Sequence, residues 1–239
     1  MNVRGIVLAA ATAAASVGVS ATPVLVNGGF ETGNLTGWTV SGSGTGSGCD
    51  TNFNVSSSGA AANCDGYSPI PPAFVAPGTG TYAAYASFDG NGPEHHTITQ
   101  AFSIAAGTTS LDIDWQDALG FGDGWIFPQP RTLSVNLLKA DGTLEATLFT
   151  ESFTNKSGGI LQNWTSYDIN ASAYLADLGT GGKLQFDLYV PQSFTGPGAF
   201  GLDNVAVTEA SSSVPEPASL ALAGLALAGL AVTLRAKRR

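Results

Sequence analysis

The chain has few residues that support metal, redox or nucleophilic chemistry. Of its 239 residues only two are cysteines and two are histidines, and charged residues make up 11% of the sequence. Two cysteines cannot build a four-thiolate zinc site, and His95 and His96 have no evident third metal ligand nearby in the sequence. The Gly-x-Ser-x-Gly elbow of hydrolases and the histidine pair of zinc proteases are also absent. The sequence therefore offers no complete catalytic motif.

Positive charge is scarce through most of the chain. Between residues 22 and 213 the basic residues are Arg131, Lys139, Lys156 and Lys183, whereas all of the 18 acidic residues except Glu216 lie there. Nucleic-acid binding needs a basic surface, so nucleic acid is excluded as a partner. Neutral sugars and divalent cations remain compatible with this composition, and solubility alone also accounts for it.

The first 21 residues have the order of a secretory signal peptide. Arg4 closes a short basic start, and residues 5–20 are uncharged, apolar and rich in small side chains. Val19-Ser20-Ala21 then places small residues at a cleavage position. We expect residues 1–21 to be removed on export.

The last 29 residues, 211–239, predict a membrane segment. A polar serine spacer leads to Val214, Pro215, Glu216 and Pro217, and residues 218–234 are uncharged and rich in Leu and Ala. A run of this length is at the lower limit for a transmembrane helix. Four basic residues end the chain: Arg235, Lys237, Arg238 and Arg239. Because Lys and Arg stay on the cytoplasmic side, the preceding domain is expected outside. An ordinary tail anchor and a C-terminal core helix are the alternatives.

The order Pro-Glu-Pro, short apolar helix and basic tail resembles the PEP-CTERM sorting signal of Gram-negative bacteria. That resemblance implies an exosortase-type processing enzyme as partner and a role in exopolysaccharide or biofilm production. It also implies a cell-surface, outer-envelope or extracellular-matrix location, with the C-terminal helix in the inner membrane before processing.

Residues 22–210 predict one all-β domain. Short runs with period-two alternation recur, as in Leu133, Val135 and Leu137, and they indicate strands with one buried face. The expected strands are 25–30, 38–40, 81–88, 97–104, 110–115, 131–139, 144–150, 165–169, 183–190 and 201–208. Only residues 172–178 look helical, and Asp141-Gly142 is a hairpin turn signal. Many strands with almost no helix predict an antiparallel β-sandwich of the jelly-roll type.

The two cysteines, Cys49 and Cys64, are predicted to form a disulfide bond, because export places them in an oxidising compartment. His95 and His96 follow the turn-forming sequence Asp89-Gly90-Asn91-Gly92, so a turn is the favoured interpretation of that segment.

Both ends of this domain resemble the jelly rolls of galactose-binding-like carbohydrate-binding modules. The matching segments are Asn27-Gly28-Gly29-Phe30-Glu31 with Trp38, residues 164–169, and Phe200-Gly201-Leu202-Asp203-Asn204-Val205. The resemblance implies a structural Ca²⁺ held by carboxylate oxygens of Glu31 and Asp203 and by backbone carbonyls. Alternatively, both residues make only local hydrogen bonds.

Sugar binding needs exposed aromatic rings beside amide or carboxylate groups. The stretch that best meets this need contains Phe121, Asp123, Trp125 and Phe127, and the alternative is that its rings belong to the core. We expect a non-catalytic binding role toward extracellular polysaccharide. The rival is a secreted carbohydrate-active hydrolase that uses Asp112, Asp114 or His95. A structural matrix protein without a small ligand is the third possibility.

Overall fold

The computed structural model describes residues 22–42, 51–57, 80–88, 93–121, 130–153, 160–191 and 198–211. The proposed signal peptide, the C-terminal segment, both cysteines, Asp123, Trp125 and Phe127 lie outside these ranges, so the predictions made for them stay predictions. Phe121 is the last residue of strand β6 (Thr108–Phe121), but the structure does not describe its side chain. Within the described ranges, no helix is both long enough and apolar enough to cross a membrane.

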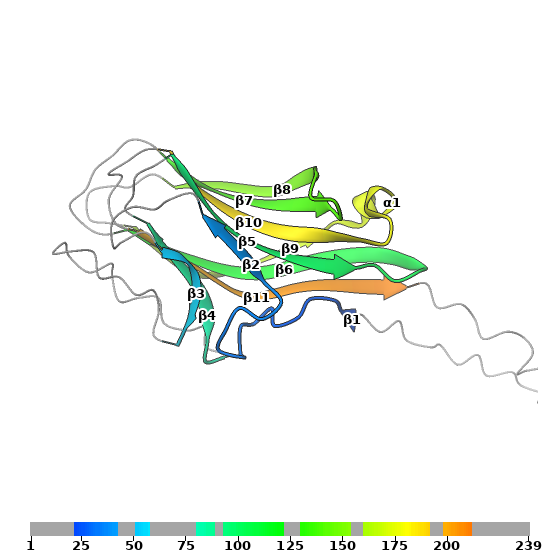
Figure 1. Ribbon diagram of the computed structural model, residues 1–239, viewed down its shortest axis with the longest axis horizontal. Coiled ribbons are helices and arrows are strands. Elements are labelled where there is room, and N and C mark those ends of the chain that lie inside the picture. Colours follow the sequence, from blue (N-terminus) through cyan, green and yellow to red (C-terminus); the bar gives the residue numbers. More distant parts are fainter. Residues whose placement is uncertain are drawn as a thin grey trace, which may run out of the picture. The chain divides into compact units, whose positions relative to one another are not determined.

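Two antiparallel sheets form the two layers of a β-sandwich (Figure 1). One sheet has the order β3-β4-β11-β6-β9, with β1 also paired to β11, and the other has the order β2-β5-β10-β7-β8. The six-stranded sheet consists of β1 (Thr22–Pro23), β3 (Thr51–Ser56), β4 (Ala83–Phe88), β6 (Thr108–Phe121), β9 (Ile160–Asn170) and β11 (Gly198–Ser211). The five-stranded sheet consists of β2 (Thr39–Gly42), β5 (Glu94–Ser103), β7 (Arg131–Lys139), β8 (Leu144–Phe153) and β10 (Gly181–Val190).

The predicted all-β sandwich is confirmed, and its core follows from the alternation in the sequence. Inward side chains such as Leu133, Val135 and Phe186 of the five-stranded sheet belong to one buried cluster with Trp115 and Phe200 of the other sheet. The short helical segment also agrees with the prediction: a 3₁₀ turn (Ser172–Tyr174) leads into α1 (Leu175–Leu178).

At one end of the sandwich, five strands end and the strands that follow them in the chain begin. Here β2, β4, β6, β8 and β10 end, and β3, β5, β7, β9 and β11 begin. In each case the strand that ends and the strand that follows it belong to different sheets. We call this the crossover end. At the opposite end, β7 and β8 are joined by a tight turn at Asp141-Gly142, as the sequence predicted.

Three local predictions differ from the structure. Residues 25–30 do not form a strand, because Asn27 and Phe30 adopt positive φ angles of 54° and turn the chain. Strand β3 was not expected, since only Phe53 and Val55 give it an apolar pattern. His95 and His96 lie in β5 rather than in a turn.

Candidate functional site

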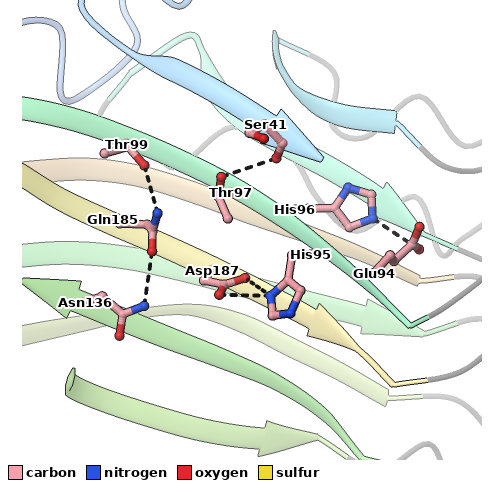
Figure 2. A network of polar contacts seen from close by, with 9 residues as sticks. All are labelled: Ser41, Glu94, His95, His96, Thr97, Thr99, Asn136, Gln185 and Asp187. Carbon is pink, nitrogen blue, oxygen red and sulfur yellow. Dashed lines mark hydrogen bonds and ion pairs between the residues drawn. The ribbon is translucent and has the colours of Figure 1, made fainter. Parts of the chain in front are cut away.

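The outward face of the five-stranded sheet carries a network of polar side chains (Figure 2). Its members come from β5, β7 and β10, and we call them the polar face: His95, Thr97, Thr99, Asn136, Gln185, Asp187 and Tyr189. They alternate along their strands with core residues, so the sequence period that builds the core also aligns these groups on the other side.

Hydrogen bonds join the polar face across three strands. Gln185 Nε2 donates to Thr99 Oγ1 at 3.4 Å, and Asn136 Nδ2 donates to Gln185 Oε1 at 3.3 Å. Asn136 Oδ1 in turn accepts from Thr147 Oγ1 at 2.9 Å. These cross-strand contacts fix the amide orientations, and a surface with fixed amides is pre-organised for a ligand that presents hydroxyl groups.

An aromatic and a charged group meet at one edge of the polar face. His95 lies opposite Tyr189 in the β5–β10 register, with ring centroids 4.7 Å apart. His95 Nδ1 contacts Asp187 Oδ1 at 2.8 Å, and the two side chains are 53% and 19% exposed. Ring faces beside a carboxylate and two amides are the groups that sugar recognition requires.

Sequence reasoning named His95 but not Tyr189, Gln185 or Asn136. These residues are distant in the chain and become neighbours only through strand pairing. The available signal was the alternation in residues 183–190, where Gln185, Asp187 and Tyr189 share one face.

The predicted calcium ligands do lie near each other. Phe30 is buried in the core and packs against Trp38, with the ring centroids 5.5 Å apart, and this contact fixes the turn that presents Glu31. An added methyl group on Gly29 would be 3.8 Å from both Asp203 Oδ1 and Glu31 Cγ, so both side chains border the same glycine.

The environment of Asp203 is unusual for a carboxylate. It is 1% exposed, and its Oδ1 accepts the Asn204 backbone N–H at 2.6 Å. Burial, with a further contribution from the charge of Glu31, raises the pKa of Asp203 to about 7. Glu31 accepts the backbone N–H groups of Thr81 and Tyr82 at 3.0 and 3.2 Å.

These two residues fit a cation such as Ca²⁺ in donor type and charge. Among the described residues, neither carboxylate forms an ion pair with a basic side chain. Within the same ranges, no third Asp, Glu, His or Cys joins them to make a larger metal-ligating group. Backbone carbonyls and water would have to complete a shell of six to eight oxygens.

A second buried carboxylate lies between the sheets near β9. Asp117 is fully buried and accepts hydrogen bonds from Trp115 Nε1 at 3.0 Å and Gln162 Nε2 at 3.4 Å. Gln162 also contacts Tyr167 Oη, which donates to Glu151 Oε2 at 3.1 Å. Burial, together with the charge of Glu151, raises the pKa of Asp117 to about 7 despite the Trp115 hydrogen bond.

The residues named for a hydrolase do not all lie on one surface. Asp112 and Asp114 point outward from β6 in the six-stranded sheet, whereas His95 points outward from the five-stranded sheet. Burial and a hydrogen bond with Asp168, its cross-strand neighbour, raise the pKa of Asp114. Asp112 accepts a hydrogen bond from Asn170 at 2.7 Å. General acid–base catalysis needs groups that reach one substrate, and His95 lies on a different surface from the two aspartates.

The family model of the PEP-CTERM protein-sorting motif matches residues 213–239. The predicted sorting signal with Pro215, Glu216 and Pro217 is thereby confirmed, and this motif implies export and membrane-anchored sorting. No curated protein matches the chain in sequence.

Several solved β-sandwich structures are similar. TmCBM61, in complex with β-1,4-galactotriose, is 17% identical, with 78% of this chain and 97% of that chain covered and a TM-score of 0.43. The K3 cleaved adhesin domain of Lys-gingipain from Porphyromonas gingivalis is 13% identical, with coverage of 77% and 99% and a TM-score of 0.46. The enzymatically active domain of bacteriophage CBA120 tailspike protein 4 is 13% identical with a TM-score of 0.44, and the match covers 78% of this chain but only 21% of the tailspike chain.

Proposed function

We propose that the β-sandwich binds extracellular polysaccharide without catalysing a reaction, and that the polar face is its ligand surface. The observation that carries the proposal is the His95–Tyr189 ring pair beside the Asp187 carboxylate on an outward sheet face. A sugar ring stacks its C–H face on the aromatic rings, while its hydroxyl groups bond to Asp187 and Gln185.

The sorting motif supports this assignment, because exported proteins with such a signal can meet extracellular polysaccharide. In the route that we propose, an exosortase-type enzyme processes the exported chain near residues 214–217, and the sandwich reaches the cell surface or the extracellular matrix. Acidic residues outnumber basic residues in the domain, so the domain repels anionic glycans and is better suited to neutral ones. We further propose a structural Ca²⁺ at Glu31 and Asp203 that joins the N-terminal segment to β11 and does not contact the ligand.

The test is retention of the full-length protein on a polysaccharide panel that includes the producing organism's own matrix. Tyr189→Ala removes the aromatic surface and should abolish retention, and Gln185→Ala should weaken it. Asp168→Asn is the matched control, because Asp168 is exposed on the outward face of the other sheet. It should bind as the wild type does.

Three outcomes would redirect or overturn the proposal. Loss of binding in Trp125→Ala but not in Tyr189→Ala would move the ligand site to the segment that the sequence analysis favoured. Turnover of any polysaccharide that is lost on changing Asp112 would support the hydrolase instead. Absence of retention on every polysaccharide would leave a structural matrix protein.

A further inference from the structure

A hydrogen-bonded network joins the two sheets on the side where β8 and β9 form the sheet edges. Its centre is Asp117, which is fully buried on the inward face of β6. Gln162 of β9 donates to Asp117 Oδ1 at 3.4 Å and contacts Tyr167 Oη at 3.3 Å. Tyr167 in turn donates to Glu151 Oε2 of β8 at 3.1 Å. Because β6 and β9 belong to one sheet and β8 to the other, the network ties β8 to the opposite layer.

The ionisable groups next to Asp117 are a carboxylate and a phenol. Burial, with a further contribution from the charge of Glu151, raises the pKa of Asp117 to about 7. Burial and the charges of Asp117 and Glu151 also raise the pKa of Tyr167, so its hydroxyl group keeps its proton. The proton that can be lost near neutral pH is therefore that of Asp117.

The other elements packed around this network present apolar side chains to it. The residue paired with Asp117 on β11 is Leu202, and the residue paired with Glu151 on β7 is Leu133. The inward residues of β10 belong to the hydrophobic core as well. Arg131, the buried basic residue of β7, lies at the crossover end, and its charge is not among those that act on Asp117.

Loss of the Asp117 proton places two negative charges in one network. While Asp117 is protonated, the negative charge is that of Glu151 alone. Once both carboxylates are ionised they repel each other, and the repulsion is strong where little water separates them. The element that can yield is β8, because among the described strands it is an edge strand paired only with β7.

Strand β8 also carries part of the support for the polar face. Phe149 packs inward against Tyr167, with ring centroids 4.8 Å apart. Thr147 lies on the other side of the strand and donates to Asn136 Oδ1 at 2.9 Å. The register with β7 shifts between these two positions, so Leu148 is the extra residue of a β-bulge, which directs the side chains before and after it to opposite sides. A movement of β8 therefore affects both the network and the polar face.

Asn136 extends this contact into the ligand surface. Its Nδ2 donates to Gln185 Oε1, so Thr147 and Gln185 together fix the orientation of the amide (Figure 2). We propose that Asp117 is a pH-sensitive switch for the polar face: loss of its proton loosens β8, releases the Asn136 amide and weakens ligand binding. The effect on binding rests on the proposed function, whereas the movement of β8 does not.

The first test needs no ligand. Hydrogen exchange of the full-length protein is measured in EDTA at pH 6 and pH 8 and is corrected for the intrinsic exchange rate. Amides of β8 should exchange at least about fivefold faster at pH 8, whereas those of β10, at the centre of the same sheet, should not change. Asp117→Asn and Glu151→Gln each remove one charge and keep a hydrogen-bonding side chain, so each should abolish the difference.

The matched control for this test is Asp203→Asn. Asp203 is also buried and its pKa is also about 7, but it borders Glu31 instead of β8. The exchange difference in β8 should therefore persist in this variant. Equal exchange at both pH values in the wild type, or a difference that persists in Asp117→Asn, would overturn the switch.

The second test repeats the retention assay at pH 6 and pH 8 with the polysaccharide that the panel identifies. The apparent affinity of the wild type should be at least about fivefold higher at pH 6, and that of Asp117→Asn should be equal at both values. His95 is an ionisable group of the polar face itself, so a pH dependence that is lost in His95→Gln and kept in Asp117→Asn would overturn the switch. A response of β8 without retention of any polysaccharide would support the movement of β8 and refute the proposed ligand surface.

Discussion

Gly28 lies against the backbone of β11 so closely that a β-carbon at residue 28 would be 1.8 Å from the Val205 carbonyl oxygen. The Val205 N–H donates to the Gly28 carbonyl at 2.9 Å on the same contact. This contact holds the turn from Asn27 to Glu31 on the last strand.

We expect Gly28→Ala to destabilise the protein by about 1–3 kcal/mol, because the backbone of β11 cannot move away without breaking its pairing. Denaturant unfolding measures the change. Gly29→Ala is the control: the nearest atom to its added β-carbon is 3.5 Å away, an ordinary contact. Equal losses in the two variants would contradict the steric explanation.

Gln100 joins the N-terminal segment to β5 by two hydrogen bonds. Its side chain is 4% exposed, accepts the Val26 N–H at 2.6 Å and donates to the Val26 carbonyl at 2.8 Å. Gln100→Leu leaves both backbone groups without partners and should cost about 2 kcal/mol or more. Hydrogen exchange should show faster exchange at Val26, whereas Gln185→Leu should leave that amide protected.

Asp117 makes stability depend on pH. The unfolded chain releases its proton near the ordinary value of 3.8, whereas the folded protein holds it up to about pH 7. The contribution of Asp117 to the free energy of unfolding therefore decreases as pH rises from 3.8 to about 7. Above pH 7 this contribution no longer changes with pH. Asp117→Asn should be more stable than wild type at pH 8 and should show a shallower decline between pH 4 and 7, measured in EDTA by denaturant unfolding. An unchanged slope would contradict the role assigned to burial.

Calcium binding should compete with the proton on Asp203. Because the pKa of Asp203 is raised to about 7, Ca²⁺ should increase the melting temperature at pH 8 and do so progressively less below pH 7. Asp203→Asn should remove the calcium effect and Asp168→Asn should preserve it. A calcium effect that survives in Asp203→Asn would place the ion elsewhere.

The sandwich could be predicted from sequence because alternation is a local signal. Leu133, Val135 and Leu137 define β7 with the same bounds, Arg131–Lys139, in sequence and structure. Glu31 and Asp203 were found through a resemblance rather than a local pattern, and the fold brings them close together.

The polar face was missed because alternation shows which residues share a face but not which strands are neighbours. His95 meets Tyr189 through the pairing of β5 with β10, although the two residues are 94 positions apart in the sequence. Likewise, polarity suggested a turn at His96, whereas the fold buries it.

The place where the chain leaves the sandwich also determines how the domain bears force. The sorting motif at residues 213–239 follows directly on β11, an inner strand paired with β6 on one side and with β4 and β1 on the other. Antiparallel hydrogen bonds run perpendicular to the strands, so a pull along β11 loads its whole ladder at once. Among the described strands, an edge strand such as β8 is paired only with β7, so the same pull on it would be resisted by one ladder instead of two. A protein tethered through its C-terminus in flowing liquid is thus attached by a strand that resists shear from both sides.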